Sequence, residues 1–211
     1  MPLYLPTGPL TPEQLDILLA AGFRRSGWFF YRTQCPNCSA CEPLRLDPAQ
    51  FKLTRSQNRV KKRGDRALVT RIANPVVDER RVELFNRHRI QRQLNHNDGA
   101  VGQEDYRSFL VNSYGQVVEL SLWLGEVLVA VSITDAGARS LSAVNCYFDP
   151  EYSHFSPGTY AILQQLQMAR AHGYDWLYLG MFVAENRHWR YKANYLPHQR
   201  FIRREWQGFS E

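Results

Sequence analysis

The chain has 211 residues, of which 44% are hydrophobic and 13% aromatic, so it can build a core and is not globally disordered. It contains no run of about twenty apolar residues, and its first ten residues lack the basic and apolar segments of a secretion signal. We therefore expect a cytoplasmic protein without a membrane span, and the net charge of +6 favours a polyanionic partner.

The N-terminal part predicts a helix, then two strands joined by a bend rich in cysteine. A helix is expected from Thr11 to Gly22, because Thr11 can cap it, Pro12 suits the first position and Gly22 can end it. "GWFFYR" and "PLRLDP" are typical of strands, and three of the four cysteines lie between them in "CPNCSAC". In a reducing compartment such cysteines indicate metal ligands or plain thiols, and a metal site of this kind would still need a fourth ligand.

A basic segment follows the cysteines. Lys and Arg crowd the stretch from Lys52 to Arg66, where the only acid is Asp65. A second basic group lies in "DERRVELFNRHRIQRQ", which is expected to be helical. Either group alone is typical of a solvated helix face, but two groups beside a cysteine bend favour binding to nucleic acid.

The second half of the chain predicts an α/β arrangement. Two β-rich runs joined around Gly125 indicate a hairpin, and "SLSAVNCYFDP" a third strand. "SPGTYAILQQLQMARAHG" predicts a helix, "DWLYLG" a fourth strand and "RFIRREW" a last one. This order indicates helices around a largely central sheet, with a soft boundary that divides the chain into residues 1–70 and 71–211.

Several long motifs resemble the aminoacyl-tRNA–protein transferases. "GFRRSG", the cysteine run followed by "PLR" and "FKLTRSQNR" are similar to the N-terminal part of that family, and "SHFSPGTYAILQQLQMARAHGYDWLYLG" and "YKANYLPHQ" to its C-terminal part. The likeness to the bacterial leucyltransferases covers nearly the whole chain. It implies an α/β (α+β) fold, with an acetyltransferase-like (GNAT) mixed sheet flanked by helices and a small N-terminal cysteine-knuckle module.

The resemblance also implies an activity and its partners. Leucine would pass from leucyl-tRNA to the α-amine of proteins that begin with Asp or Glu, marking them for N-degron degradation. An α-amine has a pKa of roughly 7.7–8.0, so part of it is neutral near pH 7 and a strong protein base is not needed. The site has to orient the amine and stabilise an oxyanion, and backbone N–H groups would serve where "SLSAVNCYFDP" and "DWLYLG" splay apart.

Candidate site residues follow from the matched motifs and from the chemistry. The catalytic candidates are Tyr178, Gly180 and Lys192. The candidates for substrate binding are Arg24, Arg25, Ser26, Arg55, Ser56, Gln57, Arg59 and Tyr191, with the arginines suited to the acidic side chain of the acceptor. Lys52, Lys61, Lys62 and Arg63 are expected to contact the tRNA backbone.

The resemblance implies no cofactor for the transfer itself, and zinc or an iron–sulfur cluster at Cys35, Cys38 and Cys41. Two departures from the family pattern bear on this. The position of the family's N-terminal cysteine is taken here by Pro2, and "MFVAENRHWRYK" replaces a Cys-x-Lys-Met segment. Cys146, on an expected core strand, is more typical of a buried thiol than of the missing ligand.

Three alternatives stay open. The donor amino acid can be arginine instead of leucine. The chain can be a degenerate RNA-binding homologue without activity, which the two departures favour and the retained motifs oppose. An acyl-CoA-dependent N-acetyltransferase is disfavoured, because "HFSPGTY" offers a single glycine where a pyrophosphate-binding loop would need several.

Overall fold

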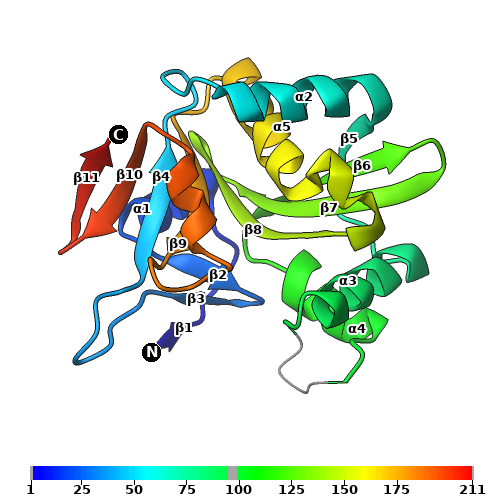
Figure 1. The fold of residues 1–211 in the computed structure, drawn as a ribbon. Coiled ribbons are helices and arrows are strands. Elements are labelled where there is room, and N and C mark those ends of the chain that lie inside the picture. Colours follow the sequence, from blue (N-terminus) through cyan, green and yellow to red (C-terminus); the bar gives the residue numbers. More distant parts are fainter. Residues whose placement is uncertain (1, 95–98, 211) are drawn as a thin grey trace.

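An eight-stranded mixed sheet forms the centre of the computed structural model, which describes residues 2–94 and 99–210 (Figure 1). The strands are Leu3–Tyr4 (β1), Arg24–Ser26 (β2), Phe29–Tyr31 (β3), Glu42–Leu46 (β4), Val69–Ala73 (β5), Gln116–Leu124 (β6), Val127–Ala136 (β7), Ser140–Phe148 (β8), Trp176–Phe182 (β9), His198–Ile202 (β10) and Glu205–Phe209 (β11). The α-helices are Pro12–Ala20 (α1), Arg55–Ala67 (α2), Glu79–Gln91 (α3), Gln103–Tyr106 (α4) and Pro157–Ala171 (α5). Shorter helical turns span Arg107–Val111 (η1), Pro150–Phe155 (η2) and Arg190–Asn194 (η3).

The order of the large sheet is β11-β10-β4-β9-β8-β7-β6-β5. Its neighbours pair antiparallel, except that β8 and β9 run parallel. β1, β3 and β2 form a separate small sheet. The crossover from β8 to β9 runs through α5, as a parallel pair requires. The expected α/β class, with a mixed sheet between helices, is confirmed.

Local sequence explains the two N-terminal helices. Thr11 accepts a hydrogen bond from the Gln14 N–H, and the Gln14 side chain returns one from the Thr11 N–H. Thr54 and Gln57 form the same reciprocal pair at the start of α2. Each pair satisfies two N–H groups that a helix start leaves open, which fixes where these helices begin.

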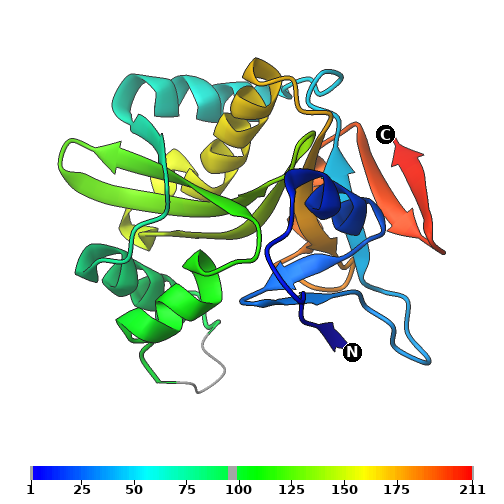
Figure 2. The ribbon, with the colours of Figure 1, turned by 180° about the vertical axis from the view of Figure 1, so that it is seen from behind.

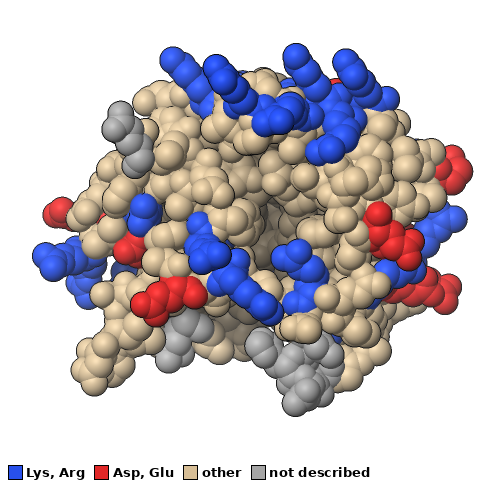
Figure 3. Space-filling view, viewed as in Figure 1, with Lys and Arg blue, Asp and Glu red and all other residues tan. Residues whose placement is uncertain are grey.

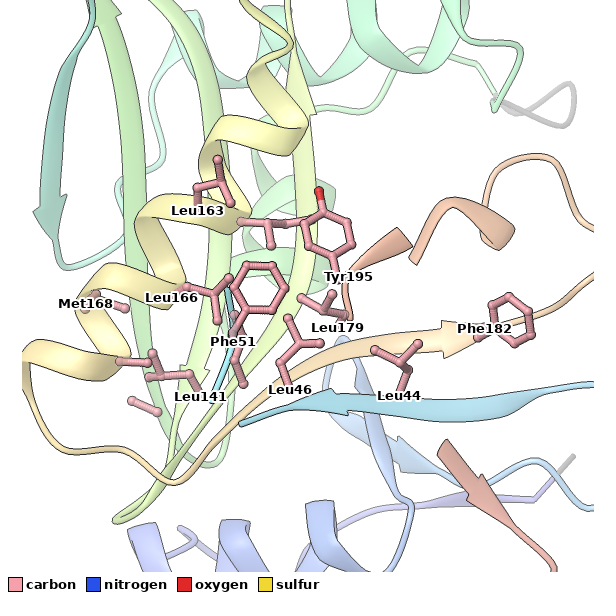
Figure 4. Packing of buried hydrophobic residues seen from close by; sticks show 14 residues of the cluster. Leu44, Leu46, Phe51, Leu141, Leu163, Leu166, Met168, Leu179, Phe182 and Tyr195 are labelled. Atoms are coloured by element: carbon pink, nitrogen blue, oxygen red, sulfur yellow. The ribbon is translucent and has the colours of Figure 1, made fainter. Parts of the chain in front are cut away.

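One face of the sheet is covered by α5, with α2 lying across α5 (Figure 1). Apolar side chains of α5 such as Leu163 and Leu166 pack with Leu44 and Leu46 of β4 and with Leu179 of β9 (Figure 4). Gly64 lets α2 approach closely, because a Cβ at this position would collide with the Tyr160 ring. The basic helix is therefore held rigidly on the body of the protein.

The opposite face carries α3 and α4 at one end and α1 with the small sheet at the other (Figure 2). Phe85 of α3 packs edge-on against Tyr106 and Tyr147, whose hydroxyls share a hydrogen bond. Leu15 and Leu19 of α1 pack with Phe30 and Tyr178. The sheet is thus enclosed by elements from both halves of the sequence.

The division at residue 70 does not correspond to a break in the fold. β4, from the N-terminal part, is inserted between β9 and β10, and it hydrogen-bonds to both. β5 begins at Val69 and completes the other end of the same sheet. Residues 1–70 and 71–211 therefore share one sheet, because the strand between β9 and β10 comes from the N-terminal part.

Within residues 2–94 and 99–210, no helix is both long and apolar enough to cross a membrane.

Candidate functional site

The parallel strands β8 and β9 separate soon after they begin. They pair only between Ser140–Ser142 and Trp176–Tyr178. Beyond these residues, Ala143–Cys146 and Phe148 of β8 and Leu179 of β9 border a cavity of about 900 Å³. Because β7 holds only one edge of β8, alternate backbone N–H groups on the other edge face the opening. The cavity therefore lies between the two strands that were predicted to separate.

The cavity opens on the face shown in Figure 3, where a hollow lies below the basic row of α2 and Lys and Arg side chains border it. Its basic lining residues are Arg89, Arg92 and Lys192, and its imidazoles are His88 and His188. Among the described lining residues the only acid is Asp105. Much of the remaining wall is apolar, with Phe85, Phe109, Phe148, Ile162 and Leu179. The cavity therefore suits a ligand that has both an anionic and an apolar part.

Lys192, one of the catalytic candidates, projects from η3 into the cavity wall. The side chain is largely buried, and Nζ donates a 2.6 Å hydrogen bond to the Met181 carbonyl oxygen. Burial, followed by the nearby charge of Arg24, lowers the pKa of Lys192 to about 7. Gly180 lies beside it with φ +83°, and a Cβ there would stand 3.5 Å from Nζ. Gly180 thus shapes the backbone next to a lysine that is half charged at neutral pH.

Arg24 of β2 is a second buried cation near Lys192. It is 4% exposed, and its Nη1 donates to the Phe23 carbonyl oxygen over 2.8 Å. Its guanidinium lies 4.7 Å from the centre of the Tyr178 ring, and its Nε and Nη2 have no hydrogen-bond partner within the described residues. Burial lowers the pKa of Arg24 to about 10. Two neighbouring cations are therefore buried, and within residues 2–94 and 99–210 no acid offsets them.

Tyr178 does not reach the cavity and belongs to the core, so its catalytic assignment finds no support in the geometry. It is 1% exposed and points to the face of β9 that α1 covers. Its hydroxyl accepts a 3.3 Å hydrogen bond from Arg45, which stacks on Trp176 and Trp206. Successive side chains of a strand face opposite sides, so Leu179 lines the cavity and Tyr178 cannot.

The segment that departs from the family pattern builds one rim of the cavity. The Asn186 side chain accepts from the His188 N–H, and the Asn186 carbonyl oxygen accepts from the Trp189 N–H. This turn places Trp189 and Tyr191 at the opening, each about two-fifths exposed. Tyr191, a predicted substrate contact, therefore lies where a substrate would enter, and the altered segment leaves the wall intact.

Another part of the wall comes from α3, which was not among the predicted site residues. His88, Arg89 and Arg92 from the last turns of this helix line the cavity. The His88 Nδ1 lies 3.0 Å from the Phe148 carbonyl oxygen, and burial lowers the pKa of His88, so the imidazole is mainly neutral at pH 7. The basic composition of this helix was visible in the sequence, but its position beside β8 was not.

Gln165 and Ser132 were also missed, because an apolar stripe on α5 and a hydrophobic strand gave no sign of them. Both line the cavity and both are almost fully buried. The Gln165 side chain donates to Ser132 Oγ over 3.0 Å and to Thr134 Oγ1 over 2.7 Å.

Arg25 is engaged in internal contacts, so the geometry does not support its assignment to substrate binding. Its Nε lies 2.9 Å from the Asp135 carboxylate, and both side chains are 1% exposed. The other nitrogens donate to the carbonyl oxygens of Gly27, Leu110 and Asn112. This guanidinium ties the small sheet to β7, so an incoming acid would have to displace Asp135. Ser26 ends β2 and is partly buried beside it.

The candidates on α2 divide into two groups. Gln57 is buried, bonded to the Thr54 backbone and 3.4 Å from the Asn194 carbonyl oxygen, so it caps the helix, and it does not line the cavity. Ser56 bonds to the Thr54 hydroxyl. Arg55 and Arg59 are exposed on the outer surface of α2, and neither lines the cavity. These two arginines are thus placed with the tRNA-binding candidates, away from the cavity.

The exposed cations of α2 form a continuous surface, seen along the top of Figure 3. We call this surface the α2 basic face; it consists of Arg55, Arg59, Lys62, Arg63 and Arg66. These positions recur every three or four residues and so lie on one side of the helix. Lys52 is exposed just before the helix, whereas Lys61 pairs with Asp65 at 2.6 Å. Lys61 therefore has its charge partly offset, and the other three predicted tRNA contacts are open to solvent.

Part of the second basic group is engaged in ion pairs, although Arg81 alone among its arginines is buried. Arg81 bonds to Glu119 and Asp78, and Arg87 pairs with Asp149 at 2.5 Å. These pairs hold α3 against the sheet, and the interpretation of the group as a nucleic-acid surface stays a prediction. Its Arg89 and Arg92 face the cavity instead.

The cysteine bend does not present a closed metal site. Cys35 and Cys38 are exposed, and Cys41 is half-buried. Burial, then the neighbouring thiols of Cys38 and Cys35, raises the pKa of Cys41. Across residues 2–94 and 99–210, no three His, Cys, Asp or Glu side chains are grouped to hold a metal ion. Metal binding at Cys35, Cys38 and Cys41 therefore stays a prediction, and Cys146 lies apart from them, lining the cavity on β8.

Two family models match most of the chain. "Arginine-tRNA-protein transferase, C terminus" matches residues 80–202, and "Arginine-tRNA-protein transferase, N terminus" matches residues 2–59. Among curated proteins, the aspartate/glutamate leucyltransferase of Aeromonas hydrophila is 39% identical over 202 residues, covering 94% of this chain and 83% of the relative. The protein of the same name from Pseudoalteromonas atlantica is 34% identical, covering 93% and 84%.

Solved structures share the fold at low sequence identity. The C-terminal domain of a putative lysylphosphatidylglycerol synthetase from Agrobacterium fabrum aligns with a TM-score of 0.53 and 16% identity, covering 80% of this chain and 51% of the other. FemX aligns with a TM-score of 0.51 and 9% identity, covering 82% and 60%. This chain thus spans only about half to three-fifths of these neighbours, and the expected acetyltransferase-like fold is confirmed.

Proposed function

The chain belongs to the aminoacyl-tRNA–protein transferase family, and on that premise we propose that it moves leucine from leucyl-tRNA to the α-amine of proteins that begin with Asp or Glu. The observation that carries the proposal is the cavity between β8 and β9, with its apolar wall, its buried cations and its open strand edge. The product would carry an N-terminal leucine and so be marked for N-degron degradation.

Leucine suits this cavity better than arginine as the transferred residue. A bound arginyl group would need carboxylates around its guanidinium. The described lining residues offer only Asp105, which is exposed, against Arg89, Arg92 and Lys192. The aromatic and aliphatic lining provides the apolar contact that a leucyl side chain requires. The electrostatics thus support a leucyl donor over the arginyl alternative.

The acidic side chain of the acceptor's first residue is complementary in charge to Lys192 and Arg24. Lys192 lies in the cavity wall, and Arg24 lies behind it with two unpartnered nitrogens. A carboxylate bound at Lys192 would offset both charges and raise the pKa of Lys192 toward its ordinary value. We assign the acceptor's first side chain to this pair, in place of Arg25, Arg55 and Arg59.

The chemical step is the aminolysis of an ester. The neutral amine attacks the carbonyl carbon, an N–C bond forms, the ester C–O bond breaks, and the ribose oxygen of the tRNA leaves as a hydroxyl with a proton from the amine. Backbone N–H groups on the open edge of β8 are suited to stabilise the oxyanion. The first turn of α5 forms part of the cavity wall and has no side-chain cap, so its N–H groups favour the phosphates near the tRNA end.

The proposal is tested by incubating the protein with charged tRNA and peptides that begin with Asp, Glu, Lys or Arg. We expect the mass of one leucine on the Asp and Glu peptides and no gain on the other two. Arginine transfer in place of leucine would establish the arginyl alternative. No transfer from any charged tRNA would instead support an RNA-binding homologue without activity.

The pH dependence of the reaction follows from two groups. The acceptor amine must be neutral, so activity rises with pH up to its pKa of about 7.7–8.0. Lys192 must be charged to bind the carboxylate, so activity falls as pH rises through its pKa of about 7. We expect kcat/KM for an Asp peptide to show a narrow optimum between about pH 7 and 8. An Asn peptide does not need a charged Lys192. Its kcat/KM profile should therefore keep the fall at low pH and lack the fall at high pH. An alkaline limb of equal size with both peptides would contradict the role of Lys192.

A further inference from the structure

A buried amide at the cavity wall has one polar atom that the fold leaves unsatisfied. Gln165 of α5 is 0% exposed and lines the cavity. Its Nε2 donates to Ser132 Oγ and Thr134 Oγ1, over 3.0 and 2.7 Å. Its Oε1 is buried and has no hydrogen-bond partner in the described part of the chain. A buried acceptor without a donor destabilises a protein, so an unpaired amide oxygen in the wall of a binding cavity calls for an explanation.

The two hydroxyls fix the orientation of this amide. The Ser132 hydroxyl donates its own proton toward the Asn145 carbonyl oxygen, 3.4 Å away, so its oxygen is left to accept from Nε2. Thr134 Oγ1 holds the other Nε2 proton. Both N–H groups are thereby committed to β7, and Oε1 remains as a pre-oriented acceptor. Since Gln165 lies on a fifteen-residue helix packed against the sheet, the amide is held without any flexible loop.

We propose that Gln165 Oε1 accepts a hydrogen bond from the α-amino group of the acceptor protein and so positions this amine for attack on the aminoacyl ester. The inference rests on the proposed transferase function and assigns one further substrate-positioning group at the same site. The amine keeps its lone pair for the ester carbon while one N–H binds the amide oxygen. Gln165 takes no proton; the amine's proton leaves with the ribose hydroxyl, as in the step above.

A neutral amide is better suited to this task than a carboxylate. A carboxylate would stabilise the protonated amine and raise its pKa, and an ammonium group has no lone pair with which to attack. An amide oxygen orients the amine with a weaker preference for the charged form. The surrounding Arg89, Arg92 and Lys192 act in the same direction, because positive charge disfavours an ammonium group. These surroundings favour the neutral form of the acceptor amine, which is the reactive species.

The test compares Gln165→Leu with the matched variant Gln167→Leu, which changes an exposed glutamine of the same helix. We expect Q165L to lower kcat/KM for an Asp peptide about tenfold to a hundredfold, while the Kd for leucyl-tRNA and the activity of Q167L stay at the wild-type values. Unchanged peptide kinetics would overturn the proposal. Loss of leucyl-tRNA affinity in Q165L, with peptide affinity retained, would overturn it too, because the oxygen would then serve the donor.

Gln165→Glu provides a second, nearly isosteric variant, which carries the test if Q165L does not fold. The introduced carboxylate should hold the amine as ammonium and shift the acidic limb of the kcat/KM profile to higher pH. An unshifted limb would contradict contact with the amine, because a structural role alone would lower activity equally at every pH. Failure of the transferase proposal is seen separately, as an absence of transfer by the wild-type protein.

Discussion

Replacing Lys192 by methionine is expected to lower kcat/KM for an Asp peptide about a hundredfold to a thousandfold, because the substrate carboxylate would lose its buried partner. Methionine keeps most of the length of the side chain and removes the charge. The loss should be specific: an Asn peptide, isosteric with the Asp peptide, should be affected far less. Steady-state kinetics with the two peptides measure the discrimination directly.

The same variant should be more stable than the wild type. Burial lowers the pKa of Lys192 to about 7, so between pH 7 and the ordinary lysine pKa the unfolded chain binds more protons than the folded one. Wild-type stability therefore rises with pH across this window. Methionine removes both the burial cost and this dependence, with an expected gain of about 1–3 kcal/mol at pH 7 in urea unfolding.

Two variants control this experiment. Arg190→Met removes an exposed cation from the same turn and should leave the discrimination between Asp and Asn peptides unchanged. Lys192→Arg should retain part of the discrimination and lose the alkaline limb of the pH profile, because arginine stays charged. If K192M handled Asp and Asn peptides as the wild type does, the carboxylate would have to bind elsewhere, with Arg92 on the rim as the next candidate.

Local sequence signals predicted the elements that build the scaffold. The Thr11 and Thr54 caps act within one turn, so both helices begin where their sequences indicate. The spacing of basic residues from Arg55 to Arg66 likewise decides which side of α2 is charged. The opening between β8 and β9 was expected only through the family resemblance, because nothing in either strand's own sequence says where the pairing ends.

The roles of single polar residues depended on partners far away in the chain. Arg24 and Arg25 are adjacent and look alike in sequence, yet Arg25 meets Asp135, 110 positions away, and Arg24 meets no acid within the described residues. Strand alternation placed one of these side chains against β7 and the other beside Tyr178. The side chain of Tyr178 likewise lies away from the cavity, because α1 covers its side of β9. The role of Gln165 could be recognised only from the structure, which places the hydroxyls of Ser132 and Thr134 beside it.

Reversing two charges on the α2 basic face, with Arg59→Glu and Arg63→Glu together, is expected to weaken tRNA binding roughly a hundredfold at low salt. The two side chains are one helical turn apart and exposed, on a helix that is anchored to α5 through Gly64 and Tyr160. Phosphate contacts of this kind position the nucleic acid without reading its sequence. The loss should therefore be similar for leucyl-tRNA and for uncharged tRNA, and the slope of log affinity against log salt should fall by about two.

The matched control reverses the same number of charges elsewhere, with Arg203→Glu and Arg204→Glu in the exposed turn between β10 and β11. Both double variants change the net charge equally, so a long-range effect of charge alone would weaken binding equally in the two. We expect only the α2 variant to lose affinity. Transfer at saturating tRNA should survive in it, because the cavity between β8 and β9 is untouched and the helix contributes to binding alone. Equal losses in the two double variants would show that tRNA is held by the overall charge of the protein, and the α2 basic face would then have no special role.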